Sequence, residues 1–522
     1  MIVKPQNIKQ TLMFSSIDEL IGPDHPVRLI NAIIDTLMKN GLHKYRVRGS
    51  AKTGRPAYSA ETLLKIFVYG YINRINSSRR LEQETYRNIE LMWLIGNLHP
   101  DHKTISDFRK ENEEVIKNFS KDLKLFLKGS VLPDNISVVI DGTKLKANAN
   151  REMISKKVIV ERLKAVENEL EIYLKQSEEY DLFETSNQEL GCSEDYLTKI
   201  SSLENEIADL KSQYDEFNRS NKNYISPTDP ECSLMKSRDG GIPAYNVQFG
   251  CDSKYNFLVY ESVTDEANDL NQLMPVVDSL ENELSIVPEQ ILADTGYSNL
   301  EIIQKIEEDK GIQCYVQMPK AKVESIKFTY DEINDCYICS QGQVLALKSR
   351  NKKARNSLVN VYVGLTCTGC PLKEQCTESK KGHHISRYVN HDFRQNHRQK
   401  MKTSEAKSNS ILRKSSIEHI HGTMKVWLGK IPLLLRGKDK VISEIRLFSI
   451  GYNIKRLLSL FSFDELMAII RSNIALNCQR TSVIFYFENK IWSLKSKVSK
   501  FFGFLTELLR IPKSSAKVSF SF

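Results

Sequence analysis

The sequence contains no long apolar run, and that absence excludes a membrane-spanning protein. No stretch of 18 residues is free of charged and polar side chains, whereas a helix that crosses a bilayer needs about 20 mostly apolar residues. The opening residues, MIVKPQNIKQTLMF, hold neither an apolar segment nor a small-residue cleavage site, so we expect no secretory signal. In an unsecreted chain, the ten cysteines indicate reduced thiols or metal ligands rather than disulfides. We therefore expect a cytoplasmic protein without a membrane partner.

Glycine is also scarce, at 23 of 522 residues, and the rest of the composition is that of a folded protein. Hydrophobic residues make up 41% of the chain, which excludes a wholly disordered protein. Because 522 residues are too many for one hydrophobic core, we expect roughly three domains.

Charge is distributed unevenly along the chain. The formal net charge of +9 favours a polyanionic partner without proving one. Residues 348–402 carry thirteen Lys or Arg against three acids, whereas residues 152–216 carry seventeen acids against seven bases. A basic and an acidic segment in one chain predict two modules with different roles. Solvated surfaces of opposite sign are the alternative.

Apolar residues at helical spacing occupy the region from Pro56 to about Ser130. Pro56 and Ser59 precede an apolar face, which is a helix start signal. We predict a helical domain at 1–130 that binds DNA or mediates dimerisation, and a helical packing domain without DNA contact is the alternative. Its basic residues include Arg74, Arg79, Arg80 and Arg109.

The acidic segment has apolar residues four and three positions apart. One uninterrupted stripe runs over 196–217, a similar one over 163–174, and Gly191 lies in the polar break between them. Two such stripes predict an antiparallel helical hairpin, inserted at 152–219 and projecting from a domain.

Around this insertion the apolar period changes to two. The pattern predicts strands at 135–143, 244–250, 255–263, 289–294 and 312–317, and helices at 270–283, 300–308 and 402–427. Between about 328 and 389 the pattern is irregular. Without the insertions the order is strand, strand, strand, helix, strand, helix, strand, helix, which is the ribonuclease-H-like order. We predict an α/β protein with a ribonuclease-H-like catalytic core.

Three carboxylates occupy significant places in this order. Asp141 ends the first predicted strand, Asp294 ends the fourth, and Glu418 lies on the last helix. Because the carboxyl ends of strands converge in an open sheet, the two aspartates are expected side by side, with Glu418 offered by the packed helix. Such oxygen donors select Mg²⁺ or Mn²⁺, and two such ions can promote phosphodiester displacement. Taken singly, either aspartate could instead cap a turn.

Several stretches of the chain resemble one known family. They are VVIDGTKLKANAN (138–150), TDPECSLMKSRDGGIPAYNVQFGCDSK (228–254), ILADTGYSN (291–299) and SSIEHIHGTMKVWLGK (415–430). They resemble DDE transposases of bacterial insertion sequences, in the insertion-sequence-four superfamily and closest to its eleven-eighty-two group. The N-terminal domain of that group is similar to GRPAYSAETLLKIFVYGYINRINSSRRLEQ and TISDFRK here. The resemblance covers roughly residues 19–457.

The resemblance implies that Asp141, Asp294 and Glu418 are the catalytic acids and hold Mg²⁺ or Mn²⁺. The family also has a lysine seven residues after the glutamate, which Lys425 provides. Two helical turns put Lys425 on the face of Glu418, where it would hold a terminal phosphate, and an ordinary surface lysine is the alternative. Where the family has a tyrosine and an arginine, this chain has Ile411 and Lys414. We expect Lys414 to contact DNA without the bidentate fork of arginine.

Cysteines form a second cluster, in the irregular region. A Cys-x2-Cys pair with further thiols nearby suits tetrahedral zinc, and reduced thiols packed in a small subdomain are the alternative. The candidate ligands of a structural Zn²⁺ are Cys339, Cys367, Cys370 and Cys376.

The basic residues of the same region are expected to face DNA. Lys352, Lys353 and Arg355 are the predicted phosphate contacts. The histidines that follow are predicted to belong to this DNA-facing surface rather than to a metal site; they are His383, His384, His391 and His397.

Together these features predict a transposase that binds its element's terminal inverted repeats, cleaves the ends and joins the 3′-OH to target DNA. We expect a homo-oligomer associated with the nucleoid. A nuclease without strand transfer and a decayed transposase that only binds DNA are the alternatives. The predicted segments are the helical domain (1–130), the catalytic core (131–151, 220–328 and 389–465), the acidic hairpin (152–219), the basic Cys-rich insertion (329–388) and a C-terminal tail (466–522).

Overall fold

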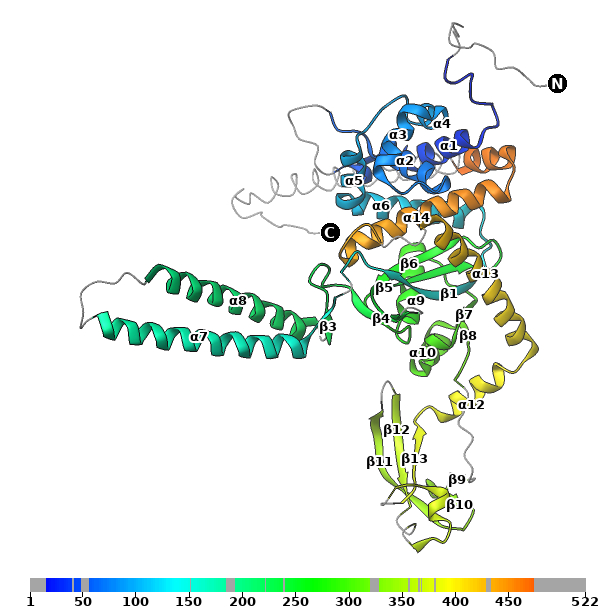
Figure 1. The fold of residues 1–522 in the computed structure, drawn as a ribbon. Coiled ribbons are helices and arrows are strands. Elements are labelled where there is room, and N and C mark those ends of the chain that lie inside the picture. The colour runs from blue at the N-terminus through cyan, green and yellow to red at the C-terminus, as the bar shows by residue number, and fades with distance from the viewer. Residues whose placement is uncertain are drawn as a thin grey trace, which may run out of the picture.

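The computed structural model is a mixed α/β protein with a mostly helical N-terminal region (Figure 1). No helix within the ranges given next is long and apolar enough to cross a membrane. The structure describes residues 16–39, 42–47, 56–150, 152–184, 193–220, 222–237, 240–319, 328–354, 357–364, 367, 369–379, 382–428 and 433–473.

Among the described residues, six α-helices lie in the N-terminal region. Side chains cap some of them: Ser59 accepts a hydrogen bond from the backbone N–H of Thr62, and Asp101 accepts one from that of Thr104. Each helix buries an apolar stripe in a shared core. Their bounds are α1 (Pro26–Lys39), α2 (Ala60–Ile72), α3 (Ser78–Arg87), α4 (Ile89–Leu94), α5 (His102–Glu111) and α6 (Glu113–Ser130).

A six-stranded sheet forms the centre of the molecule. β1 pairs antiparallel with β5 on one edge and parallel with β7 on the other, and β8 continues the parallel part. β5 also pairs antiparallel with β4 and β6. The bounds are β1 (Ser137–Lys146), β4 (Ser233–Ser237), β5 (Gly240–Asp252), β6 (Leu258–Thr264), β7 (Gln290–Ala293) and β8 (Gln313–Val316).

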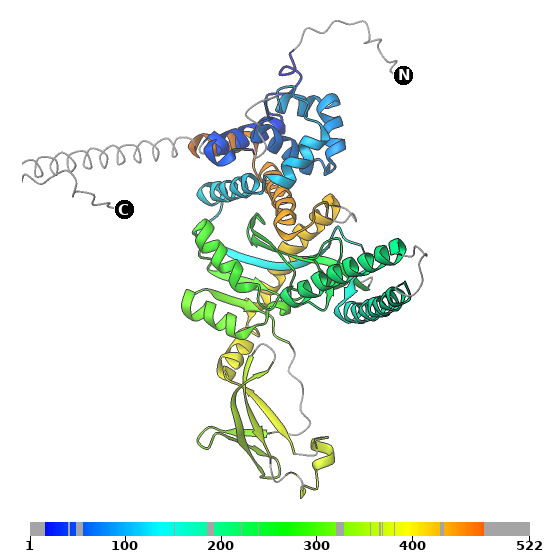
Figure 2. The same cartoon turned by 90° about the vertical axis from the view of Figure 1, so that its left-hand side faces the viewer.

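Four helices accompany this sheet. α9 and α10 connect β6 to β7 and β7 to β8. α13 packs against β1, β7 and β8, whereas α14 packs against β6 and against the N-terminal helices α2 and α6. Both views show α14 between the helical region and the sheet (Figures 1 and 2). The bounds are α9 (Leu273–Leu284), α10 (Leu300–Lys310), α13 (Ser404–Leu428) and α14 (Lys438–Leu460).

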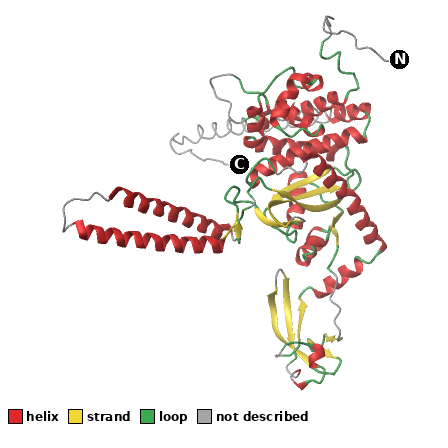
Figure 3. Ribbon diagram, in the orientation of Figure 1, coloured by secondary structure: helices red, strands yellow, loops and turns green. Residues whose placement is uncertain are grey.

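The acidic segment projects from the sheet as two long helices (Figure 3). α7 (Lys156–Glu184) and α8 (Ser193–Ser220) contact each other, and the short strands β2 (Ile154–Ser155) and β3 (Tyr224–Ile225) pair at their base. The helices have an apolar cluster of their own that includes Val166, Leu203 and Phe217. They share no core with the rest of the described chain.

The region whose sequence pattern is irregular folds as a five-stranded antiparallel sheet (Figure 3). Tyr337, Leu345 and Tyr362 form its separate small core. The helix α12 (His391–Lys400) then leads back to α13. The strands are β9 (Phe328–Asp331), β10 (Cys336–Cys339), β11 (Val344–Ala354), β12 (Ser357–Val363) and β13 (His384–Tyr388), with the short helix α11 (Lys373–Cys376) before β13.

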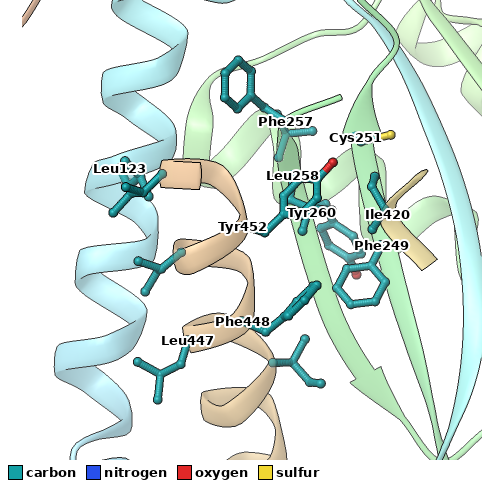
Figure 4. Close-up of a cluster of buried hydrophobic side chains, with 14 of the residues drawn as sticks. Leu123, Phe249, Cys251, Phe257, Leu258, Tyr260, Ile420, Leu447, Phe448 and Tyr452 are labelled. Atoms are coloured by element: carbon teal, nitrogen blue, oxygen red, sulfur yellow. The ribbon is translucent and has the colours of Figure 1, made fainter. Parts of the chain in front are cut away.

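One continuous core joins the N-terminal helices, the sheet and α14. Phe448 and Tyr452 of α14 point towards Phe249 and Leu258 of the sheet, and Leu123 of α6 lies on the other side of α14 (Figure 4). Buried aromatic side chains of this size contribute about 1.5–3 kcal/mol each relative to exposed ones. The helical region therefore cannot separate from the sheet without exposing α14.

A buried ion pair crosses the same junction. The Glu261 carboxylate on β6 accepts hydrogen bonds from the Lys124 ammonium and the Ser120 hydroxyl of α6, and from the Ser449 hydroxyl of α14. Three donors satisfy this buried carboxylate, which would otherwise be costly to bury. The pair therefore fixes the register between the three elements.

The core extends beyond the end of α14. Residues 463–473 are helical, and Leu466 and Ile470 are buried in the main core, so this core includes part of the predicted tail. The remainder of that tail, 474–522, lies outside the described residues.

Candidate active site

Two of the predicted acids come from adjacent parallel strands. Parallel pairing of β1 with β7 ends at Val139 opposite Leu292, and Asp141 follows two residues later. Asp294 follows the last residue of β7, and its Oδ1 accepts a hydrogen bond of 2.7 Å from the Gly296 N–H. The prediction that Asp141 ends its strand is wrong. β1 continues to Lys146 because β5 still supplies backbone partners on its other edge, with Asp141 opposite Phe249.

The environment of Asp141 disfavours its negative charge. Burial and the nearby charge of Asp294 raise the pKa of Asp141 to about 6, with a further contribution from Asp269. The Arg413 guanidinium and the backbone N–H of Gly142 act in the opposite direction without cancelling the rise. The two aspartates are therefore close enough to repel each other, as a cation-binding carboxylate pair does.

Asp269, which the sequence reasoning missed, is the third carboxylate at this place. Its Oδ1 accepts hydrogen bonds of 2.7 Å from the side-chain amides of Asn246 and Gln248 on β5. A Cβ added to Gly142 would lie 2.6 Å from this Oδ1, so glycine is needed for the approach. Asp269 follows β6 in an irregular segment, where no periodic pattern marks it.

A second layer of hydrogen bonds supports Asp269. The buried Tyr297 hydroxyl donates to Gln248 Oε1, and the amide of Gln248 donates to Asp269. Burial, followed by the charges of Asp269 and Asp141, raises the pKa of Tyr297, so it remains a neutral donor. This network ties the segment after β7 to the neighbouring strand β5.

Helix α13 supplies two further residues that the sequence reasoning missed. Arg413 Nη1 lies 3.7 Å from Asp141 Oδ2, and His421 Nδ1 lies 4.0 Å from the same oxygen. Burial, Lys425 and Arg413 lower the pKa of His421 to about 4, so the imidazole is neutral at pH 7. Only Arg413 therefore brings a positive charge to Asp141 from this pair. Arg413 is the neighbour of Lys414, which the family resemblance had selected, and this proximity could have identified it.

The remaining predicted residues of α13 are exposed. The Glu418 carboxylate forms no hydrogen bond or ion pair with any residue that the structure describes, and Lys414 is exposed beside Arg413. Glu418 lies one turn before His421 and so borders the strip of α13 that faces Asp141. Lys425 is close enough to His421 to influence its pKa. The structure thus brings Asp141 and Asp294 together, and holds Glu418 and Lys425 at the rim.

The donor chemistry at this place fits a hard divalent cation. Carboxylate oxygens that repel each other are the ligands that Mg²⁺ and Mn²⁺ prefer. As the side chains stand, no group of three His, Cys, Asp or Glu within the described ranges is arranged to hold a metal ion. A ligand from α13 would require the exposed Glu418 side chain to turn towards the aspartates.

The predicted zinc ligands lie in the β9–β13 subdomain. The Cys370 N–H donates to the Cys367 carbonyl at 3.3 Å, and Cys376 Sγ lies 3.5 Å from His383 Nδ1. The rings of His383 and Phe328 stack at 4.6 Å, and Phe328 is opposite Cys339 in the sheet. His383 therefore contacts Cys376, one of the candidate zinc ligands, although the sequence analysis predicted that His383 belongs to a DNA-facing surface.

The histidine prediction fails for His397. This side chain is 2% exposed, and its Nε2 donates to the Val316 carbonyl at 2.9 Å. Burial lowers its pKa. Through this hydrogen bond it anchors α12 to β8, and because it is buried it cannot contact DNA. The predicted phosphate contacts Lys352 and Lys353 are exposed on β11, whereas Arg355 lies outside the described residues.

Comparisons with known proteins agree with this geometry. The family model described as "Transposase domain (DUF772)" matches residues 15–111, and "Transposase DDE domain" matches residues 338–458. The first covers most of the helical region, and the second includes α13 and most of α14. These matches support a DDE transposase.

Other comparisons add little. No curated protein sequence matches the chain. A solved structure, described as a cryo-EM structure of piggyBac transposase in a synaptic complex with hairpin DNA, has a TM-score of 0.30 and 10% identity. The match covers 89% of this chain and 83% of that one. A similarity with so low a TM-score carries no conclusion about this chain.

Proposed function

We propose that this protein is the transposase of an insertion sequence, of the insertion-sequence-four superfamily and its eleven-eighty-two group. It binds the terminal inverted repeats, cleaves the ends with divalent metal and joins the 3′-OH to target DNA. The observation that carries the proposal is the pair Asp141 and Asp294, on adjacent parallel strands beneath the helix that holds Glu418. The strand order β6-β5-β1-β7-β8 supports a ribonuclease-H-like core.

Each residue has a distinct role in the proposed reaction. Asp141, Asp294 and Glu418 would hold Mg²⁺, which supplies activation of the attacking oxygen and charge stabilisation of the leaving oxygen when bound. The network of Asp269, Gln248 and Tyr297 keeps Asp294 and its turn against the sheet. Arg413 neutralises part of the charge on Asp141.

DNA phosphate is held by cations at the rim in this proposal. Lys425 lies two helical turns after Glu418 on the same face and would hold the terminal phosphate. Lys414 and the exposed Lys352 and Lys353 would contact the backbone elsewhere. No covalent nucleophile from the protein is required, because positioning and charge stabilisation suffice for phosphoryl transfer.

The decisive experiment is a strand-transfer assay with Mg²⁺ on DNA that carries the element ends. Asp141→Ala, Asp294→Ala and Glu418→Gln should each abolish cleavage while leaving binding of the terminal DNA largely intact. Glu405→Gln is a matched control, since Glu405 begins the same helix and hydrogen-bonds to Tyr315 instead. Cleavage near the wild-type rate in one acid variant would remove that residue from the catalytic set. Cleavage without joining would identify a nuclease.

A further inference from the structure

A basic cavity lies on the side of α13 that faces α14. It has a volume of about 490 Å³ and is lined by Arg74, which follows α2, and by side chains of α13 and α14. Lys455 and Arg456 of α14 contribute two more cations, and the wall contains Trp427 and Thr423 of α13. None of the described residues that line it is acidic.

The cations of this cavity lack the acidic partners that others on α14 have. Lys438 pairs with Asp265 at 3.1 Å, and Arg446 pairs with Glu113 at 3.3 Å. Within the described ranges, Arg74, Lys455 and Arg456 form no ion pair with a carboxylate. Burial and the nearby charge of Arg74 lower the pKa of Lys455, so these two like charges lie close together, whereas the charge of Arg456 also acts on the buried Asp252.

The side chains around these cations are ordered by the protein. Arg456 Nε donates to the Tyr255 carbonyl at 2.7 Å, and the Lys455 ammonium lies 5.1 Å from the centroid of the Trp427 ring. Arg74 has a φ of 62°, a left-handed conformation that is uncommon for a residue other than glycine. Lys455 and Arg456 are thus held in place, and the exposed Arg74 lines the same opening, so three positive charges gather where a polyanion can approach.

We propose that this cavity binds a phosphate group of the DNA backbone, beside the candidate active site. The inference rests on the proposed function, because that function makes DNA the source of the phosphate. Helix α13 contributes to both the candidate active site and the cavity. His421 faces Asp141, whereas His419 and Thr423 line the cavity. A helix is about 10 Å across, so one DNA strand that crosses α13 near Glu418 can reach both sides. A free phosphate-bearing small molecule would present the same chemistry, and the experiment separates the two.

The first arm measures how the affinity of full-length protein for duplex DNA depends on salt. Each phosphate contact removed should reduce the slope of log K against log salt by about 0.9. The double variant Arg74→Asn with Lys455→Gln removes the one phosphate contact of the cavity and should therefore lower the slope by about 0.9. Asparagine tolerates the left-handed backbone of position 74. Lys455→Arg keeps the charge and should leave the slope close to that of wild type.

The control for the loss of charge alone is Lys440→Gln, because Lys440 is an exposed lysine near the start of α14, the helix that carries Lys455. It should leave the slope close to wild type. An equal fall in the control, or an unchanged slope in the double variant, would overturn the proposal. Each variant must unfold at a midpoint near that of wild type. If the double variant does not, the single variant Lys455→Gln replaces it.

The second arm is a titration with inorganic phosphate in the absence of DNA. Binding is monitored by the fluorescence of Trp427, and the variant Trp427→Phe serves as the reference. A saturable change in wild type that the double variant loses supports the phosphate site. Saturable phosphate binding together with an unchanged DNA slope would overturn the DNA assignment in favour of a small anion. If wild type binds no DNA at all, the proposed function fails, and the phosphate titration still decides whether the cavity takes phosphate.

Discussion

Asp141 shows how one residue can oppose stability while serving a site. Its carboxylate is largely buried beside Asp294 and receives only partial compensation from Arg413, 3.7 Å away. The folded protein therefore binds a proton at Asp141 more tightly than the unfolded chain does, because the pKa rises from 3.8 to about 6. Ionised Asp141 consequently costs folding free energy above pH 6, and the cost disappears as the pH falls below 4.

Because ionised Asp141 destabilises the folded state, we expect Asp141→Asn to be more stable than wild type in the absence of divalent metal. At pH 7.5 the variant should be more stable than wild type by about 3 kcal/mol, because the pKa of Asp141 rises from 3.8 to about 6 and each pKa unit corresponds to about 1.4 kcal/mol. The gain should fade as the pH is lowered from 6 towards 4, since wild type then becomes neutral as well. Denaturant unfolding across this range with a chelator present is the measurement. Added Mg²⁺ should stabilise wild type alone. A variant that is less stable at pH 7.5 would refute the argument.

Sequence reasoning found the aspartates but missed their neighbours for a physical reason. Asp141 and Asp294 follow apolar runs, so a strand pattern marks them. Asp269 lies in an irregular segment and reaches the site only through its contacts with β5. Arg413 and His421 lie on a helix that was predicted, but which of its faces meets the sheet depends on packing.

At the scale of elements, α13 has three differently used sides. One strip carries Arg413 and His421 towards Asp141, and another borders the basic cavity with Thr423. Ile417, Ile420 and Met424 are buried between the helix and the core. A helix with a period of 3.6 residues can hold all three functions because adjacent residues point about 100° apart. Its rigid packing places Glu418 relative to the strands.

The exposed strand β11 gives a separate prediction for DNA affinity. Lys352 and Lys353 are exposed on it, in a segment of high positive charge. Lys352→Gln with Lys353→Gln should lower the slope of log K against log salt by about 1.8, because two phosphate contacts are lost. Lys157→Gln with Lys164→Gln removes the same charge from α7 and should have no such effect. Equal slopes for the β11 variant and wild type would assign these lysines to solvation.

Elements were predicted where the apolar period was clean. The stripe at 196–217 lies within α8, and the stripe at 163–174 lies within α7. The five strands β9–β13 were not predicted, because their inner residues form only a small core of Tyr337, Leu345 and Tyr362. A two-residue period is weak when so few positions are buried. The cross-strand partners of such a sheet are set by tertiary contacts.

At the scale of the whole molecule, buried clusters define which parts depend on each other. The N-terminal helices, the central sheet and α14 share one core, so they should unfold together. The α7–α8 hairpin has its own cluster and joins the sheet region through the β2–β3 pair and the loops around it. Lys222, just after α8, is held by the carbonyls of residues 230–232 and by Asp265, on the side of the main domain.

This separation predicts that the hairpin can be removed. Replacing residues 156–220 with a short Gly/Ser linker shortens only the connection between β2 and β3, which already pair as Ile154 with Ile225. The shortened protein should stay soluble, unfold cooperatively near the wild-type midpoint and keep its divalent-metal binding. Calorimetry and a Mn²⁺ titration on both proteins are the measurements.

A point variant tests the same independence without shortening the chain. Leu203 is 3% exposed in the hairpin cluster, so Leu203→Asp should melt the hairpin by burying a charge without a partner. The main transition should stay in place, because no residue of that cluster belongs to the main core. The acidic helices repel the DNA phosphates, so neither change should weaken DNA binding. Loss of both cooperative unfolding and metal binding in the shortened protein would show that the hairpin is part of the catalytic core.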